Sequence, residues 1–408
     1  MKTNKNIWIF NHYAITPALP GGTRHFDFAK ELVKRGYKVS IFASSFLHGQ
    51  FKVIREHSVN NFMVEEYDGI RFVWIKTFPY YRNDLRRIIN MLSYSVRAYK
   101  VAKKINVEKP DIIIGSSVHL FAVFAAYLIS KKYKVPFIME VRDLWPQTLI
   151  DMGVPKWHPF VIILGFLEKF LYKKANKIIV LLPKANMYME NLGVSPDKII
   201  WIPNGVDLRR FDKSNNQIEN DKSSFIITYM GAIGMANNLD VIIEVAEILK
   251  ESYKELKFLL VGEGPEKDRL AKIVKNKNLH NVEFKENIPK DKVSEILCNS
   301  DALFFHLKDT PVFNYGISSN KLFDYLASGK PIIFASNSIN NPVEEAKAGI
   351  TVPPNNPQAI AQAIIKLYKM SDEDRKEIGI NGRKYVEKNH SIAILVDKLE
   401  KVIKECEV

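Results

Sequence analysis

Cysteine is scarce in this sequence of 408 residues, with Cys298 and Cys406 its two instances. Two cysteines outside any CxxC pattern argue against a disulfide framework and against a structural zinc site. Long hydrophobic runs are missing as well. The apolar run near the N-terminus has about five residues, and the patch at 160–165 is also too short to span a bilayer. We therefore expect a cytoplasmic protein without a signal peptide or a transmembrane helix.

Acidic residues are scarce in the first half of the chain. Residues 1–205 hold 30 Lys and Arg against 15 Asp and Glu, whereas residues 206–408 hold 29 against 30. The net charge of +14 is therefore confined to the first half. This asymmetry predicts a polyanionic partner for that half, which is a nucleic acid, an anionic membrane surface or a phosphorylated substrate. A merely solvated basic surface is the simpler alternative.

Short apolar runs alternate with helical patterns along the whole chain. We expect strands at 7–10, 37–44, 111–117, 136–141 and 177–182, and again at 225–231, 256–264, 281–287, 301–307 and 331–336. Fully apolar strands separated by helices indicate parallel βαβ units with helices on both faces of the sheet. The sequence therefore predicts an α/β fold of two Rossmann-like, doubly wound domains that face a central cleft, where ligands bind at the carboxyl ends of strands.

The domain boundaries follow from a polar segment without apolar periodicity, residues 213–224. We expect a first domain over 1–208, a linker over 209–224 and a second domain over 225–390. Residues 391–408 form an amphipathic pattern with no strand after it, and we expect this helix to pack on the first domain.

Four strand-to-helix turns in the second half have the composition of ligand-binding turns. They contain Gly231, Gly234 and Asn238, then Gly262 and Gly264, then Ile288, and finally Ser319, Asn320 and Lys321. A helix start presents free N–H groups and a partial positive charge, so it binds phosphates. We predict that Lys321 and this helix start hold a diphosphate, and that Asp324, one turn on, accepts hydrogen bonds from a ribose. A capped helix with an ordinary Lys321–Asp324 ion pair is the alternative.

The first half offers fewer polar residues at strand ends. Gly21 and Gly22 allow close backbone approach, and Arg24 opens the following helix. His119 follows the predicted strand at 111–117, and Asp143 follows the strand at 136–141. We expect His119, Asp143 and Arg24 to face the cleft, although a glycine pair or a lone histidine is often structural.

Residues 80–104 combine basic and aromatic side chains. They carry one acidic residue and seven basic ones, namely Arg82, Arg86, Arg87, Arg97, Lys100, Lys103 and Lys104. A basic helix with interleaved apolar residues can lie on an anionic membrane. The apolar segment 157–174 can dip into the same surface. The alternatives are a nucleic-acid patch for the first segment and a core helix for the second.

The chain as a whole resembles a known family. The segments PGGTRHFDFAKELVKRGYKVSIFAS, NGVD, YMGAIGMANNLD, VGEGP and NKLFDYLASGKPII occur in the order and at the spacing of the retaining glycosyltransferases of family 4, which have the GT-B fold. DLWPQ and GISSNKLFDYLASGKPI are similar to a subgroup that assembles bacterial O-antigen and capsule repeat units. That subgroup adds a sugar to a lipid-diphosphate-linked acceptor at the inner membrane face.

This resemblance implies transfer of a hexose from a nucleotide-diphosphate sugar, UDP-linked by family habit, with the acceptor on the first domain and the donor on the second. Asp324 matches the second acid of the family's two-acid signature, and the first position falls on Gly316. The turn GAIGMANN lacks the family's Arg and Lys, so Lys321 supplies that charge. His119 matches a histidine that contacts the transferred sugar. The loop at Gly21, Gly22 and Arg24 matches one near the donor phosphates, and Leu322 belongs to the matched donor motif.

We expect no cofactor and no metal ion, since no Asp-x-Asp sequence follows a predicted strand as a metal clamp. We also expect no nucleic-acid partner, because no nucleic-acid motif is present. The expected location is the cytoplasm, peripheral on the inner face of the cell membrane. Two alternatives remain, which are a GT-B sugar-nucleotide 2-epimerase and a non-catalytic polyanion-binding protein. The charge split argues against the first, and the four ligand-type turns argue against the second.

Overall fold

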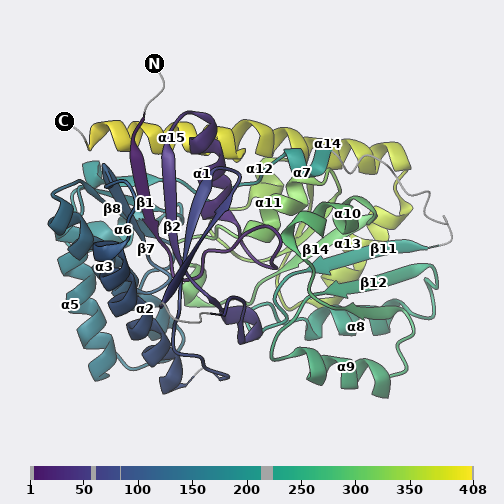
Figure 1. Cartoon of the computed structure of the whole chain (residues 1–408). Coiled ribbons are helices and arrows are strands. Elements are labelled where there is room, and N and C mark those ends of the chain that lie inside the picture. Colours follow the sequence, from purple (N-terminus) through teal and green to yellow (C-terminus); the bar gives the residue numbers. More distant parts are fainter. Residues whose placement is uncertain (1–3, 57–60, 83, 213–223, 407–408) are drawn as a thin grey trace.

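The computed structural model describes residues 4–56, 61–82, 84–212 and 224–406, and it has two α/β domains side by side (Figure 1). Each domain is built on its own sheet, and helices cover both faces of each sheet. The apolar runs seen in the sequence are the buried strands of these sheets, as expected for parallel strands covered on both sides. The predicted two-domain α/β fold is confirmed. Most of the expected linker, residues 213–223, lies outside the described residues.

The first sheet has eight strands and one antiparallel edge. Its order is β10 (Ile199–Trp201), β9 (Lys177–Val180), β8 (Phe137–Val141), β7 (Ile112–Ser116), β1 (Asn6–Phe10), β2 (Lys38–Ser44), β6 (Ile70–Ile75) and β5 (Phe62–Tyr67). A small ribbon of β3 (Phe46–Leu47) and β4 (Lys52–Val53) stands apart, around η1 (His48–Gln50). The helices of this half are α1 (Arg24–Lys34), α2 (Leu85–Lys104), α3 (Leu120–Tyr133), α4 (Gln147–Asp151), α5 (Pro159–Lys174) and α6 (Ala185–Asn191), with η2 (Pro196–Lys198).

The second sheet is entirely parallel, with the strand order 3-2-1-4-5-6 of a dinucleotide-binding fold. Its strands run β13 (Val282–Lys285), β12 (Leu256–Val261), β11 (Phe225–Met230), β14 (Ala302–His306), β15 (Ile332–Ala335) and β16 (Gly349–Val352). The connecting elements are α8 (Asp240–Leu249), α9 (Lys267–Asn276), η3 (Lys290–Lys292), α10 (Val293–Cys298), η4 (Pro311–Phe313), α11 (Asn320–Ala327), α12 (Pro342–Glu345), α13 (Pro357–Lys369) and α14 (Asp372–Asn389).

The chain crosses between the domains twice. It first crosses at α7 (Arg209–Asp212), and it returns through α15 (Ile392–Glu405), which lies along the first domain in Figure 1. The apolar face of α15 joins the core formed by β1, β2 and α1. Arg35, the residue that follows α1, binds Asp397 and Glu400 of α15 at 2.6 Å each. The expected return of the C-terminal helix to the first domain is therefore confirmed.

Within the described ranges, no helix combines the length and the apolar character needed to cross a bilayer.

Candidate active site between the domains

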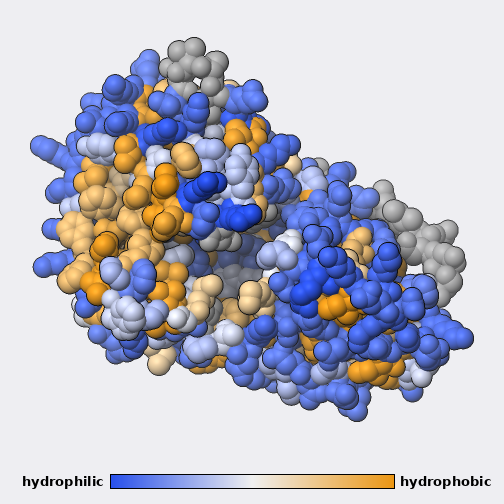
Figure 2. Space-filling view, turned by 90° about the horizontal axis from the view of Figure 1, so that it is seen from below, coloured by the Kyte–Doolittle hydropathy of each residue, from blue (hydrophilic) through white to orange (hydrophobic). Residues whose placement is uncertain are grey.

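The molecule is hollowed between its two lobes (Figure 2). A cavity of about 330 Å³ lies between the domains, with walls from both. The first domain contributes residues that follow β8, and the second contributes the segment before and at the start of α11. The polar lining comprises Arg142, Asp143, Gln147, Thr148, Asp151, Asn204, Asn237, Ser318, Ser319, Asn320 and Lys321. Asp143, Ser319, Asn320 and Lys321 were predicted from the sequence.

Each sheet has a topological switch point, where the order of strand connection reverses, between two central strands. In the second sheet the switch lies between β11 and β14, and in the first it lies between β1 and β7. Ligands of open α/β sheets bind beyond the carboxyl ends of the strands at such a point. The turn after β11, which carries Gly231 and Asn237, therefore stands where a donor is expected.

Lys321 reaches this turn from the start of α11. Its Nζ lies 2.6 Å from Asn237 Oδ1 and 3.1 Å from Tyr229 Oη, over the rings of Tyr229 and Phe305. Burial of the ammonium lowers the pKa of Lys321 to about 7. A phosphate at this point would favour the charged form of Lys321. Lys321 thus brings a cation to a turn that itself contains no basic residue.

The glycine loop of the first domain meets the same helix start. A Cβ placed at Gly22 would lie 2.6 Å from Asn320 Nδ2. Gly22 therefore permits the two domains to approach at this point. Gly21 lies beside Ile15, within the first domain. The backbone N–H groups of Lys290 and Asp291 donate to Leu19 and Pro17 of the same loop at 3.3 Å, so the loop closes one side of the cleft.

Asp324 is buried and forms an ion pair with Lys290, a residue that the sequence analysis did not select. The alternative of an ion pair between Lys321 and Asp324 is wrong, because these two side chains take separate partners. Lys290 was missed because it stands in a polar turn rich in lysine, where no single residue is distinguished by pattern.

Gly316 leaves no room for the acid that the family has at this position. Its φ is +96°, and a Cβ would lie 2.6 Å from Pro183 Cγ and 2.7 Å from Asn340 Oδ1. Asn340 Oδ1 already accepts the Ile317 N–H at 2.8 Å. Glycine is therefore required by the backbone and by close neighbours, and no carboxylate can extend from position 316.

The other glycine turns of the second domain pack on one another. A Cβ at Gly262 would lie 1.9 Å from Gly231 O, and one at Gly264 would lie 2.2 Å from Ile233 O. Gly234 faces open space. Asn238 turns away from the cleft, since its Nδ2 donates to Asn355 Oδ1 at 2.7 Å. Its neighbour Asn237 contacts Lys321 and lines the cleft cavity.

Two further donor residues contribute little side chain to the cleft. Leu322 is 1% exposed and packs in the core of the second domain, so only its backbone can face a ligand. Ile288 is half-buried against the same core, in the turn that leads to Lys290. The donor contact predicted for Leu322 therefore stays a prediction that concerns its backbone.

Arg24 lies in the interior of the first domain and does not line the cleft cavity. Its Nε donates to Glu140 at 2.8 Å and its Nη2 to Ile202 O at 3.0 Å. Glu140 also contacts His25 Nε2 at 2.7 Å. Burial acts to raise the pKa of the Glu140 carboxyl, but the charge of Arg24 and the hydrogen bond with His25 hold it well below the usual range. The expectation that Arg24 faces the ligand is corrected. The sequence feature that could have predicted this buried ion pair is Glu140, a carboxylate inside the apolar strand 136–141.

His119 caps the start of α3 and is buried. Its Nδ1 accepts the Ala122 N–H at 3.1 Å, and its Nε2 lies 2.7 Å from His12 Nδ1. Burial lowers the pKa of His119 to about 3, so the ring is neutral at physiological pH. His12 was not selected from the sequence, although it follows a predicted strand end as His119 does.

Asp143 is solvent-accessible within the cleft although protein surrounds it. This enclosure raises the pKa of its carboxyl, and the neighbouring Arg142 partly offsets the effect. Asp143 is thus a carboxylate that enters the cleft from the first domain, across from the start of α11.

The basic residues of segment 80–104 differ in their exposure. Arg82, Arg86, Lys100, Lys103 and Lys104 are exposed. Arg87 and Arg97 are half-buried, and Arg97 donates to Lys76 O at 2.7 Å. Of the seven predicted basic residues, five therefore lie at the surface and two lie partly buried against the protein.

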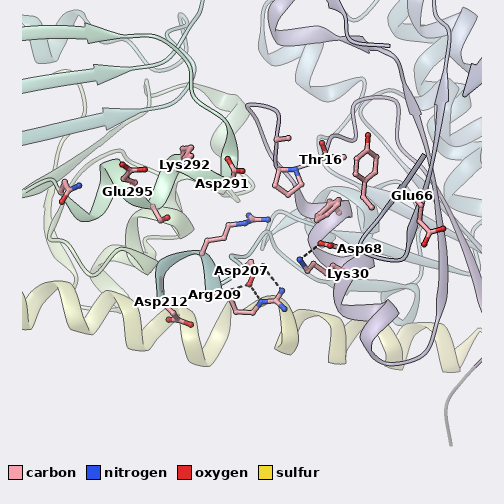
Figure 3. A pocket seen from close by; sticks show the side chains of 17 residues that line it. Thr16, Lys30, Glu66, Asp68, Asp207, Arg209, Asp212, Asp291, Lys292 and Glu295 are labelled. Atoms are coloured by element: carbon pink, nitrogen blue, oxygen red, sulfur yellow. Dashed lines mark hydrogen bonds and ion pairs between the residues drawn. The ribbon is translucent and has the colours of Figure 1, made fainter. Parts of the chain in front are cut away.

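A second, larger cavity of about 1230 Å³ lies on the side of the interdomain crossing (Figure 3). Its walls come from α1, the 16–18 loop and α7, together with η3 and α10, and none of the predicted site residues lines it. Figure 3 shows acidic and basic side chains interleaved around it, including Lys30, Asp68, Asp207 and Arg209.

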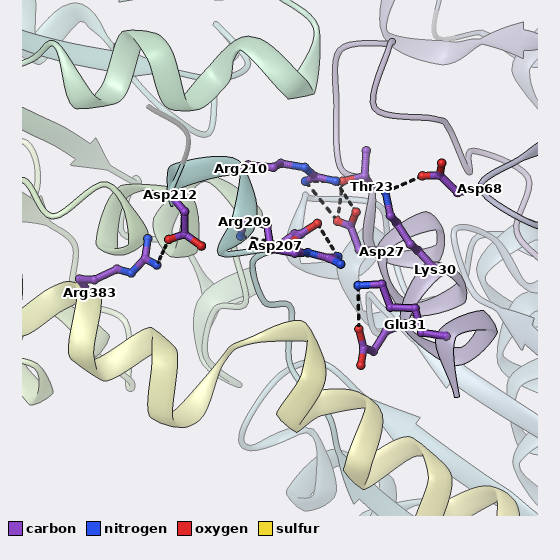
Figure 4. A network of polar contacts seen from close by, with 11 residues as sticks. Thr23, Asp27, Lys30, Glu31, Asp68, Asp207, Arg209, Arg210, Asp212 and Arg383 are labelled. Carbon is purple, nitrogen blue, oxygen red and sulfur yellow. Dashed lines mark hydrogen bonds and ion pairs between the residues drawn. The ribbon is translucent and has the colours of Figure 1, made fainter. Parts of the chain in front are cut away.

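These charges are largely paired with one another (Figure 4). Arg210 binds Asp27, and its Nη1 donates to Thr23 Oγ1 at 3.2 Å. Arg209 Nε lies 2.7 Å from Asp207 Oδ1, and Asp212 lies 2.6 Å from Arg383. These ion pairs attach α7, where the chain first crosses between the domains, to both domains. We therefore assign the network a structural role, which is to hold the domains together.

Two sequence families match the chain in the order of its domains. Residues 21–210 match "Glycosyltransferase Family 4", and residues 210–385 match "Glycosyl transferases group 1". The chain belongs to the GT-B glycosyltransferases of these two families.

Curated relatives are glycosyltransferases by name. WcaI of Escherichia coli strain K12, named for colanic acid biosynthesis, is 25% identical over 284 residues, which is 66% of this chain and 69% of that protein. WbjE of Pseudomonas aeruginosa is 20% identical over 334 residues, which is 79% of this chain and 82% of that protein. The protein is thus related to enzymes of polysaccharide biosynthesis.

Solved structures share the fold over the whole chain. Sucrose-phosphate synthase of Thermosynechococcus elongatus has a TM-score of 0.75 at 16% identity, covering 98% of this chain and 99% of that one. HepE of Anabaena, solved with UDP and glucose, has a TM-score of 0.68 at 14% identity, covering 98% and 100%. At these identities the likeness shows the GT-B fold alone.

Proposed function

We propose that the protein transfers a hexose, with retention of configuration, from a UDP-linked sugar to a saccharide joined through a diphosphate to a lipid. The product belongs to a surface polysaccharide such as O-antigen or capsule. One observation carries the donor part, namely that Gly22, Asn237, Asn320 and Lys321 meet at one point of the cleft. The name of WcaI supports the polysaccharide part, and the HepE complexes support uridine.

The donor diphosphate is assigned to the start of α11. The free N–H groups there and the ammonium of Lys321 are oriented before the ligand arrives, so they stabilise the charge that develops on the leaving diphosphate. Closure of the 16–22 loop on η3 and on Asn320 excludes water, which limits hydrolysis of the donor. We propose that this step needs neither a metal ion nor a cofactor.

Asp143 is assigned to the hydroxyl groups of the donor sugar or the acceptor. It is a carboxylate in the cleft, and position 316 excludes the acid of the family signature. Asp143→Asn should lower kcat while the affinity for UDP stays within about twofold. An unchanged kcat would remove Asp143 from the reaction.

The membrane part of the proposal concerns the surface of α2 and α5. Leu85, Trp157 and Phe166 are each more than 70% exposed. Hydrophobic side chains gather over the lobe that carries these helices in Figure 2. Exposed cations flank them at Arg86, Lys100, Lys103 and Lys104. We propose that this face lies on an anionic bilayer.

Vesicle flotation tests the membrane part. Wild type should bind vesicles with 30% phosphatidylglycerol and not neutral vesicles, and a triple change of Lys100, Lys103 and Lys104 to Gln should abolish the difference. Equal binding of the wild type to anionic and neutral vesicles would contradict the assignment.

Thermal-shift titration with UDP, GDP, ADP and dTDP, with and without magnesium, tests the donor. UDP alone should raise Tm, with a shift that grows with concentration as mass action requires. Equal shifts with all four nucleotides, or none with UDP, would contradict the donor site. Proton NMR of the product, with a coupling constant that reports the anomer, tests retention.

A further inference from the structure

His12 and His119 stand at the switch point of the first sheet, after β1 and β7. The Ala122 N–H donates to His119 Nδ1, so His119 carries its proton on Nε2 and donates to His12 Nδ1. His12 then carries its own proton on Nε2, and within the described residues this buried donor has no partner. A buried donor without an acceptor is costly, and it points to a ligand or water oxygen nearby.

Aromatic side chains and further polar atoms surround this pair. His12 stacks on Tyr13 at 4.4 Å, and Tyr13 stacks on His48 at 4.8 Å. Trp145 Nε1 is also buried without a partner among the described residues. These two buried atoms, His12 Nε2 and Trp145 Nε1, come from the loops that follow β1 and β8.

A cavity of about 140 Å³ adjoins His119. Its polar lining consists of Asp84, Arg87, His119 and Trp145, and Asp84 also accepts the Arg86 N–H as the cap of α2. The remaining wall is apolar and is formed by Ile88, Met91, Leu120, Phe121, Leu149, Phe160 and Leu164. At about 30 Å³ for each water-sized group, the space admits only a short piece of a ligand.

Arg87 supplies the positive charge of this cavity. Its neighbour Arg86 is exposed, whereas Arg87 is half-buried. The charge of Arg87 contributes to lowering the pKa of His119, after burial, and it acts in the same direction on His12 and His48. Arg87 lines the cavity together with His119, and it is less exposed than Arg86.

We infer that this cavity holds the phosphate-bearing end of the acceptor, an alkyl diphosphate whose phosphate pairs with Arg87 and whose first chain carbons lie against the apolar wall. The inference deepens the proposed function and rests on it. A polar end with one arginine and a wall of seven apolar residues match an amphiphile better than an inorganic anion or a free sugar. The exposed apolar side chains of α2 and α5 continue from this wall toward a bilayer.

Isothermal calorimetry with decyl diphosphate as the probe tests the inference, with Lys131→Gln, which removes an exposed cation of α3, as the control. Wild type and Lys131→Gln should bind the probe alike, and Arg87→Gln should bind it at least tenfold more weakly. Inorganic diphosphate and decanol should each bind wild type at least tenfold more weakly than decyl diphosphate. Leu149→Asp, which places a charge in the apolar wall, should weaken binding of the probe by a similar factor. This second variant tests the site if Arg87→Gln does not fold.

UDP affinity, measured in parallel, separates this inference from the donor assignment. It should be the same in all four proteins. Equal binding of the probe by Arg87→Gln and wild type would contradict a binding site at Arg87. If inorganic diphosphate bound as tightly as the probe, the inference that the ligand is an amphiphile would be wrong. If the wild type did not bind UDP, the donor site would be contradicted, whether or not the probe binds.

Discussion

Lys321 and Asp324 lie one turn apart on α11, and their side chains leave the helix toward different partners. Lys321 Nζ lies 2.6 Å from Asn237 Oδ1 in the turn after β11, whereas Asp324 is paired with Lys290 of η3. Because η3 also donates two backbone hydrogen bonds to the 16–22 loop, α11 connects the donor turn to the interdomain contact.

Lys321→Ala should reduce turnover while the fold is retained. A charged contact to the leaving diphosphate that is made most strongly in the transition state contributes on the order of 2–4 kcal/mol, or about 30- to 1000-fold in rate. Steady-state kinetics with saturating acceptor measures the loss. Lys272→Ala, an exposed lysine on α9, serves as the control and should retain full activity.

The affinity for UDP should fall as pH rises above about 7. Burial lowers the pKa of Lys321 to about 7 in the empty site, and a bound diphosphate raises it, so binding above pH 7 takes up a proton. The empty protein should correspondingly gain stability between pH 7 and about 10, because the unfolded chain binds the proton that the folded chain has lost. Calorimetry in two buffers with different ionisation enthalpies measures the uptake. Lys321→Arg should show none, and proton uptake equal to wild type in that variant would exclude Lys321 as its source.

The fold was predictable because its strands are continuous apolar runs. All ten expected strands exist, with ends that differ by at most three residues. The hairpin of β5 and β6 was missed because β5 is an edge strand with alternating, half-exposed residues such as Glu65 and Glu66. The short β10 and β16 were missed for want of length, as they have three and four residues.

The candidate site was predictable where a backbone pattern decides it, and less so where side chains choose partners. The turn at Gly231 and the helix start at Lys321 follow from strand ends and glycines. The partners of Arg24 and Asp324, namely Glu140 and Lys290, lie 116 and 34 residues away, and only the folded packing of the domains brings them together.

Lys290→Met should destabilise the protein by about 3–5 kcal/mol, because it leaves the buried carboxylate of Asp324 without its cation. The double variant Lys290→Met/Asp324→Leu should recover much of that loss, since removing both charges removes the desolvation cost of each. Urea denaturation gives the free energies of unfolding. Additive losses in the double variant would show that the two side chains do not interact.

Gly316→Ala should destabilise the protein by about 1–3 kcal/mol or more, owing to a positive φ and to the contacts with Pro183 and Asn340. Gly316→Glu, which restores the family acid, should lose stability and gain no activity. Gly234→Ala is the matched control, because its Cβ meets open space. A Gly316→Glu enzyme with raised kcat would show that the acid can be accommodated after all.

His306 should act on the donor site through Asn237, without touching the ligand. Its Nδ1 donates to Asn237 O at 2.7 Å and its Nε2 accepts the Asn355 N–H at 3.2 Å, so the ring fastens the turn after β11 to the loop before α13. Burial lowers the pKa of His306 to about 4, which keeps the ring neutral.

His306→Ala should raise the KM for the donor several-fold and leave the acceptor KM unchanged, because the freed turn no longer holds Asn237 against Lys321. His306→Asn keeps an amide donor near the position of Nδ1 and should restore part of the donor KM. A general loss of stability would instead lower activity with both substrates alike in both variants, so the ratio of the two KM values decides whether His306 positions the donor turn.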